Sequence, residues 1–256
     1  MKTKLTHWAL LLAGLAISST GFAAITWQTD GGTNCSDVTT CYGNTRSYSG
    51  SSGSTTVIAS AWANTVGSGN TQIENAYLGV YSGGGLGVTN RDGANGTDAN
   101  EGVSPEHALD NDGRIDAILF SFSSAVSLTG VQIGWYSTDS DISLLAYTGA
   151  GTPTMAGKTF SDLLLSGWSV VGNYADAAAT SVKAVNTTNI SSSYWLISAY
   201  NSGYGTGTGL TTGNDYEKIL ALQGNVTPPK VTVPLPSSLM LMGAGLVGWL
   251  RMRKTA

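Results

Sequence analysis

Residues 115–122 read IDAILFSF and residues 126–135 read VSLTGVQIGW, and these two stretches give the clearest signal for the fold. In the second stretch apolar side chains recur at every other position on either side of Gly130, with a change of phase at that glycine. A period of two is typical of a β-strand with one buried face. A β-bulge at Gly130 would account for the change of phase. We therefore predict two β-strands here.

Similar segments recur along the chain, separated by turns rich in Gly, Ser and Asn. A short helix is predicted at 160–165, capped by Ser161 or Thr159. No long amphipathic helix and no internal repeat competes with the strands. We therefore predict an all-β fold, a single antiparallel β-sandwich or jelly-roll domain over residues 24–226. The other expected strands are 57–66, 76–80, 139–147, 168–174, 194–200 and 218–222.

The first 23 residues have the pattern of a secretory signal peptide. Lys2 and Lys4 precede the apolar run WALLLAGLAI at 8–17, and Gly21 and Ala23 supply small residues before a cleavage site. This order of basic, apolar and small residues is that of a removable export signal. The alternative, a short N-terminal anchor, is less well supported because the run is short for a membrane span.

The C-terminal residues form a second signal with three parts. A Pro-rich linker at 227–233 leads to a Pro-x-Pro turn, then to an apolar run at 237–250, and then to a basic cluster. Counted from Ser237, this run gives a helix of roughly 21 Å, shorter than a hydrocarbon core of about 30 Å. A thin span suits a sorting helix that is processed, and a permanent tail anchor is the alternative.

The tail resembles the PEP-CTERM sorting signal of Gram-negative bacteria over residues 234–256, although Leu235 stands where that motif usually has Glu. The resemblance implies recognition by an exosortase and export linked to exopolysaccharide or biofilm. It also implies that the protein meets the membrane only through this helix of the precursor. The residues that carry the sorting motif are Val233, Pro234, Pro236, Arg251, Arg253 and Lys254.

A second resemblance covers roughly residues 76–172. It rests on AYLGVYSGGGLGVTN, on PEHALDNDGRIDAILFSF and on VQIGW followed by DSDISLLAYTG. These runs are similar to a family of exosortase-dependent surface proteins. The resemblance implies an extracellular all-β domain attached to a sorting tail, and it brings no catalytic residues.

Charge excludes one class of partner. All 16 acidic residues lie between the two signals, whereas five of the 12 basic residues lie within them, which leaves seven bases and a net charge near −9. Nucleic-acid binding needs a basic surface, so we expect no nucleic-acid partner.

The two cysteines, Cys35 and Cys41, are predicted to form a disulfide, as is usual for a close pair in an exported chain. A redox pair or half of a metal site is the alternative, but the spacing is not Cys-x-x-Cys. The loop that the bond closes is short, so its entropic contribution is below about 3 kcal/mol.

The segment DNDGRID at 110–116 is the strongest candidate site. Asp110, Asp112 and Asp116 alternate with other residues around a glycine, as oxygen ligands do in calcium loops. An EF-hand is excluded, because its first and last ligand positions would fall on Ala108 and Leu119. We keep two readings open: a looser calcium site, or an Asx-rich turn in which Arg114 pairs with a neighbouring carboxylate.

Catalysis finds little support in the sequence, and we expect a protein that is not an enzyme. His107, the sole histidine after the signal peptide, could act as a general base or zinc ligand, but a structural role is commoner. No Gly-x-Ser-x-Gly elbow is present.

Three functions remain as hypotheses. The first is a structural or adhesive surface protein in an exopolysaccharide-containing envelope. The second is a carbohydrate-binding module, with or without calcium, in which aromatic rings on the predicted strands stack on sugars. The candidates are Trp62, Trp135, Trp168, Trp195 and several tyrosines, although packing in the core is the default role of aromatics on strands. The third is a glycoside hydrolase that uses carboxylates near 110–116.

Overall fold

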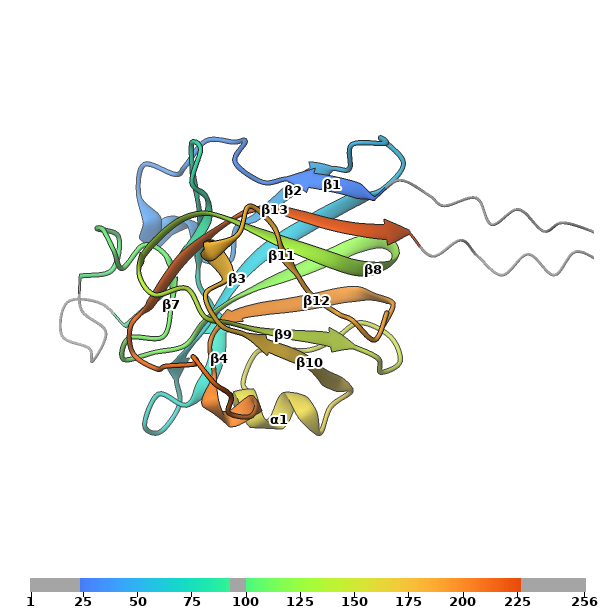
Figure 1. Cartoon of the computed structure of the whole chain (residues 1–256). Helices are drawn as coiled ribbons and strands as arrows, with labels where there is room; N and C mark the ends of the chain where they lie inside the picture. Colours follow the sequence, from blue (N-terminus) through green and yellow to red (C-terminus); the bar gives the residue numbers. More distant parts are fainter. Residues whose placement is uncertain (1–23, 93–99, 227–256) are drawn as a thin grey trace, which may run out of the picture. The chain divides into compact units, whose positions relative to one another are not determined.

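The computed structural model describes residues 24–92 and 100–226, which form an antiparallel β domain with a few short helices (Figure 1). The predicted all-β class is confirmed. The expected signal peptide, linker and sorting signal lie outside the described residues. Within those ranges, no helix has both the length and the apolar character needed to cross a membrane.

One long strand, β8 (Asp116–Thr138), organises the domain. Its first part, 117–122, pairs with β3 (Thr56–Val66) on one side and with β12 (Ser192–Ala199) on the other. Its second part, 126–138, pairs with β13 (Asp215–Val226). The prediction of two separate strands was therefore wrong, because the intervening residues stay extended and carry β8 from one half of the sheet into the other.

The predicted bulge near Gly130 is confirmed. Gln223 of β13 lies opposite Gly130, but the next residue, Gly224, lies opposite Leu128, so Thr129 is the extra residue. The alternation of buried side chains changes phase here because one residue has no partner in the opposite strand.

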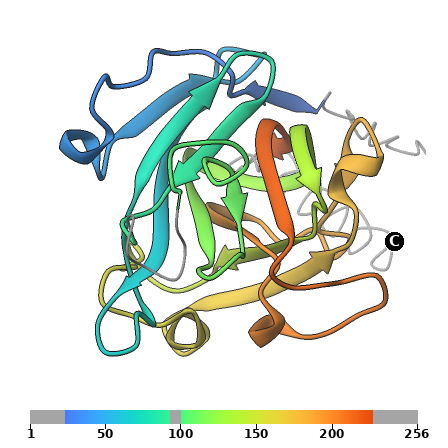
Figure 2. The same ribbon diagram turned by 90° about the vertical axis from the view of Figure 1, so that its left-hand side faces the viewer.

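The strands pair into one open sheet that folds over on itself, with the order β10-β9-β12-β8-β13-β6-β5 along its main path. A sandwich would have two separate sheets; here β8 belongs to both halves. Figure 2 shows the curvature of the sheet from the side. The remaining strands are β1 (Ile25–Gln28), β2 (Thr45–Ser49), β4 (Gln72–Asn75), β5 (Tyr77–Tyr81), β6 (Gly85–Thr89), β7 (Leu109–Asp110), β9 (Ile142–Tyr147), β10 (Trp168–Tyr174) and β11 (Lys183–Ala184).

The main core lies between the two halves of the folded sheet. Alternate residues of β8, Ile118 and Phe120, face it from one half, and Ile219 of β13 faces it from the other. Trp27 of β1 is fully buried and packs edge-on against Phe122, with ring centroids 4.9 Å apart. Because side chains from both halves share this core, neither half could bury its apolar face alone.

A second core covers the opposite face of β9, β10 and β12. The short helix α1 (Phe160–Leu164) closes it with Phe160 and Leu163, and Figure 1 shows α1 beside β10. Thr159 caps the helix in a reciprocal pair with Asp162, which confirms the predicted helix and one of its two proposed caps.

The predicted disulfide is present between Cys35 and Cys41. It stabilises the loop that precedes β2 and contains the 3₁₀ helix Val38–Cys41. The loop is also attached to the sheet, because the backbone N–H of Cys35 donates a hydrogen bond to the Tyr77 hydroxyl at 3.0 Å.

The turn between β5 and β6 brings two backbones into close contact. Gly85 has φ of +100°, and a Cβ at this position would overlap the backbone carbonyl of Ile219. Gly83, in the same turn, has φ of +72° but open space around it. Both positions favour glycine for its backbone conformation, and only Gly85 also needs it for packing.

We therefore expect Gly85→Ala to destabilise the domain by at least about 3 kcal/mol and Gly83→Ala by only about 1 kcal/mol. Urea denaturation of the two variants measures the difference. Equal losses of stability would show that β6 does not approach β13 as closely as described.

Candidate ligand pocket and acidic clusters

A surface pocket of about 410 Å³ lies on the face of β8 and β13 that points away from the main core. Lys218 contributes to it, whereas its neighbour Ile219 points into the core, as the alternation of a strand requires. The turn between β5 and β6 and the segment before β7 form its walls. The lining residues are Tyr81, Ser82, Gly83, Gly84, Ser104, His107, Gly134, Trp135 and Lys218.

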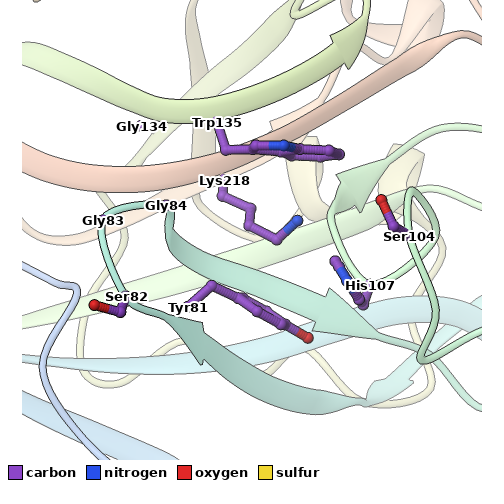
Figure 3. A pocket seen from close by; sticks show the side chains of 9 residues that line it. All are labelled: Tyr81, Ser82, Gly83, Gly84, Ser104, His107, Gly134, Trp135 and Lys218. Carbon is purple, nitrogen blue, oxygen red and sulfur yellow. The ribbon is translucent and has the colours of Figure 1, made fainter.

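Lys218 lies between two aromatic rings in this pocket (Figure 3). Its Nζ lies 3.5 Å from the centroid of the Trp135 ring and 4.7 Å from that of Tyr81. Both contacts are cation–π interactions when the amine is protonated. Burial lowers the pKa of Lys218 to about 7, and Asp110 partly opposes this effect. The pocket therefore holds an amine that changes charge near neutral pH.

His107 completes the aromatic wall. Its ring stacks on Tyr81 with centroids 4.5 Å apart and lies 6.4 Å from Trp135. Burial, followed by the nearby Lys218 charge, lowers the pKa of His107. Its Nδ1 has no hydrogen-bond partner among the described residues. His107 therefore contributes mainly its stacked ring to the wall of the pocket.

The backbone fixes the position of His107 closely. The backbone N–H of Val88 in β6 donates to the Ala108 carbonyl at 2.9 Å, and a Cβ on Gly87 would overlap the His107 carbonyl. His107 belongs to neither of the two groups of potential metal ligands found in the described part of the chain. The geometry thus places it with the aromatic rings and away from the carboxylates.

The predicted calcium residues are partly brought together. Asp110 and Asp116, both fully buried, join Glu101 in a group whose carboxylate oxygens lie within 4.8 Å of one another. Asp112 points elsewhere and accepts a hydrogen bond from the Tyr216 hydroxyl at 2.8 Å. The sequence did not indicate Glu101, because it lies in an irregular segment nine residues before Asp110.

The alternative reading of this loop also finds support. The Asp112 backbone N–H donates to Asp110 Oδ1 at 3.2 Å, which is an Asx turn. Arg114 forms a salt bridge with Asp92 at 2.7 Å. The turn and the cluster thus coexist, and calcium binding by this group remains a prediction.

The sequence did not connect the members of a second acidic group. Asp215 lies far along the chain from Asp139 and Asp141, yet the carboxylate oxygens of the three residues lie within 4.8 Å of one another. Burial raises the pKa of Asp215 to about 7, and burial also raises the pKa of Asp141. These residues meet because the backbone of Asp139 bridges in parallel to Asp215 at the start of β13.

Glu217 adds a fourth carboxyl next to this group. It is fully buried, and neither of its oxygens has a hydrogen-bond partner among the described residues. Burial raises the pKa of Glu217 well above its usual value, and the charges of Asp215, Asp141 and Asp139 raise it further. The charged groups that raise the pKa of Glu217 are therefore all acidic.

The comparisons with known proteins concern the C-terminal tail. Residues 232–254 match the family model of the PEP-CTERM protein-sorting motif. The chain carries a PEP-CTERM sorting motif. All six predicted motif residues fall inside this match, although they lie outside the described residues. No curated protein and no solved structure matches the chain.

The PEP-CTERM motif supports an exported protein that is processed by an exosortase and sorted to the cell surface from a membrane-anchored precursor. Leu235 between Pro234 and Pro236 does not prevent the match. The match begins after the last strand of the β domain, so the ligand of that domain has to be inferred from its own geometry.

The buried Glu217 allows a test of the group formed by Asp139, Asp141 and Asp215. A group whose folded-state pKa is raised contributes most to stability below its unfolded pKa, near 4.5, and this contribution is lost as pH rises through the folded value. In buffer with a chelator, we expect Glu217→Gln to stabilise the domain at pH 7 by about 1–3 kcal/mol and to have little effect at pH 4.5. Chemical denaturation at several pH values measures both.

Glu74→Gln is the matched control for this substitution. Glu74 is half-buried at the surface and paired with Arg91 at 3.5 Å. Its loss should reduce stability by at most about 1 kcal/mol. If Glu217→Gln destabilised the domain to the same extent at both pH values, the Glu217 carboxyl would have to be stabilised by a partner, and the prediction would be wrong.

Proposed function

We propose that this chain is an exported surface or matrix protein with an adhesive role, and that its β domain binds glycans of the envelope or of an exopolysaccharide matrix. The observation that carries the proposal is the pocket in which Trp135, Tyr81 and His107 surround Lys218 on the outer face of the sheet. The sorting motif supports the location, because a surface protein encounters these polymers.

The chemistry of the pocket suits a sugar. A volume of about 410 Å³ falls within the range of about 300–1,000 Å³ typical of small-ligand sites. The aromatic rings offer apolar surface to the C–H face of a pyranose. Ser82 and Ser104 offer hydroxyl groups for hydrogen bonds to sugar hydroxyls, and Lys218 offers an ammonium for a sugar carboxylate.

A binding role is favoured over hydrolysis by the placement of the carboxyl groups. A glycosidase needs two carboxyl groups on either side of the scissile bond, about 5–10 Å apart. None of the described residues that line the pocket is acidic. Asp110 and Asp116, on which the hydrolase hypothesis depends, are fully buried and do not line the pocket, so a sugar bound there would not contact them.

Lys218 supports a preference for acidic sugars such as uronic acids. It is the one lysine or arginine among the described lining residues, in a domain whose charge is strongly negative. Burial disfavours the charge of this amine and lowers its pKa to about 7. A bound carboxylate would stabilise that charge and would be held by it.

The test is retention of the protein on a panel of acidic and neutral polysaccharides. Trp135→Ala should weaken binding to the retained glycan by about tenfold or more, because an aromatic anchor contributes at least about 1.4 kcal/mol. Tyr136→Ala is the matched control, since Tyr136 is the next residue of β8, is 52% exposed and does not line the pocket.

The proposal predicts that Tyr136→Ala binds like the wild-type protein. Retention on no polysaccharide of the panel would contradict a glycan-binding role. Equal losses in the two variants would show that binding does not use the pocket.

A further inference from the structure

We propose that Asp139, Asp141 and Asp215 bind a calcium ion where β9 and β13 begin. This site is separate from the glycan pocket, because Asp215 and Lys218 leave β13 on opposite faces. It uses none of the carboxylates of the 110–116 loop, where the sequence suggested calcium, although Asn111 of that loop hydrogen-bonds Asp215. It therefore does not rest on the proposed glycan-binding function.

The carboxylates of Asp141 and Asp215 are held in place by neighbouring donors. Asp141 accepts the backbone N–H groups of Asp176 and Thr211, each at 2.8 Å. Asp215 accepts the Asp141 N–H at 2.8 Å and the Asn111 side-chain amide at 2.5 Å. Each of these oxygens keeps a lone pair free, and their positions are set before any ion arrives.

Asp139 lies at the half-exposed side of the group. Its Oδ1 accepts the Ser140 N–H at 2.8 Å, and its Oδ2 accepts the Thr211 hydroxyl at 2.8 Å. The same hydroxyl lies 2.8 Å from the side-chain oxygen of Asn214. Neutral oxygens therefore lie next to the carboxylates, and an ion could enter from this side.

Glu217 gives an independent indication that a cation belongs here. It follows Asp215 by two residues on β13, so both side chains leave the strand on the same face. A fully buried carboxyl without a hydrogen bond is costly, and a nearby divalent ion would offset both its charge and that of the cluster.

The set of donors favours calcium. The three residues supply oxygen alone, with no nitrogen or sulfur, which suits a hard cation. Calcium binds six to eight oxygens at about 2.3–2.6 Å, so its ligands lie up to about 5 Å apart, in keeping with a group whose oxygens lie within 4.8 Å of one another. Magnesium needs a smaller and more regular octahedron at about 2.0–2.1 Å.

Such an ion would connect three segments that adjoin the ends of different strands. Asp139 and Asp141 precede β9, the loop at 211–214 precedes β13, and Asp176 follows β10. The segments already meet through hydrogen bonds to Asp141 and Asp139. Calcium would therefore act as a structural ion that fixes this end of the domain.

The experiment uses the full chain, treated with a chelator and then titrated with CaCl₂ alone, and follows both the melting temperature and the heat of binding. At calcium 100-fold above the dissociation constant, Tm should rise by on the order of 5 °C. Asp139→Asn, which keeps an acceptor for the Ser140 N–H, should weaken calcium binding at least tenfold. Glu101→Gln makes the same change in charge in the other acidic group and should leave the affinity unchanged.

Glu217→Gln is a second variant that keeps the three proposed ligands, and it should also weaken calcium binding. The inference is overturned if calcium produces neither a shift in Tm nor a heat of binding in the wild-type protein. It is also overturned if Glu101→Gln abolishes binding while Asp139→Asn keeps it, since the ion would then bind at the other group. Unchanged calcium affinity in both Asp139→Asn and Glu217→Gln would also overturn the inference.

Discussion

The structure depends on the continuity of β8 from Asp116 to Thr138. This strand pairs with β3 and β12 in one half of the sheet and with β13 in the other. Because the two halves share one strand and one core, they should unfold together. The same strand presents Trp135 to the pocket, so the position of the candidate ligand site follows from the register between β8 and β13.

Strand β13 connects the two candidate sites through the alternation of its side chains. Asp215 and Glu217 lie on the face of β13 that carries the acidic group, and Lys218 lies on the face that carries the aromatic pocket. Both faces carry ionisable groups in surroundings that disfavour their charged forms, which is unusual for a strand in the middle of a sheet. A ligand of opposite charge on each face would relieve this cost, so one physical argument supports both the glycan and the calcium proposals.

The sequence predicted the features that depend on local pattern. The period of two in 126–135 identified extended backbone, Gly130 marked the bulge, and Thr159 marked the start of the short helix. The strands that were missed, such as β1, β2 and β6, are short and rich in polar residues or glycine. They are stable only because longer strands pair with them, which a local pattern does not show. The acidic group around Asp215 was missed for the same reason, since its members come from distant segments.

Native-state hydrogen exchange along β8 tests the central claim most directly. If β8 is one continuous strand that couples the two halves, the amides of 117–122 and of 126–138 should exchange through the same global unfolding, with equal free energies of opening and equal dependence on denaturant. If one segment exchanged through an opening several kcal/mol lower than the other, the two halves would be independent, and the account of how β8 positions the pocket would be wrong.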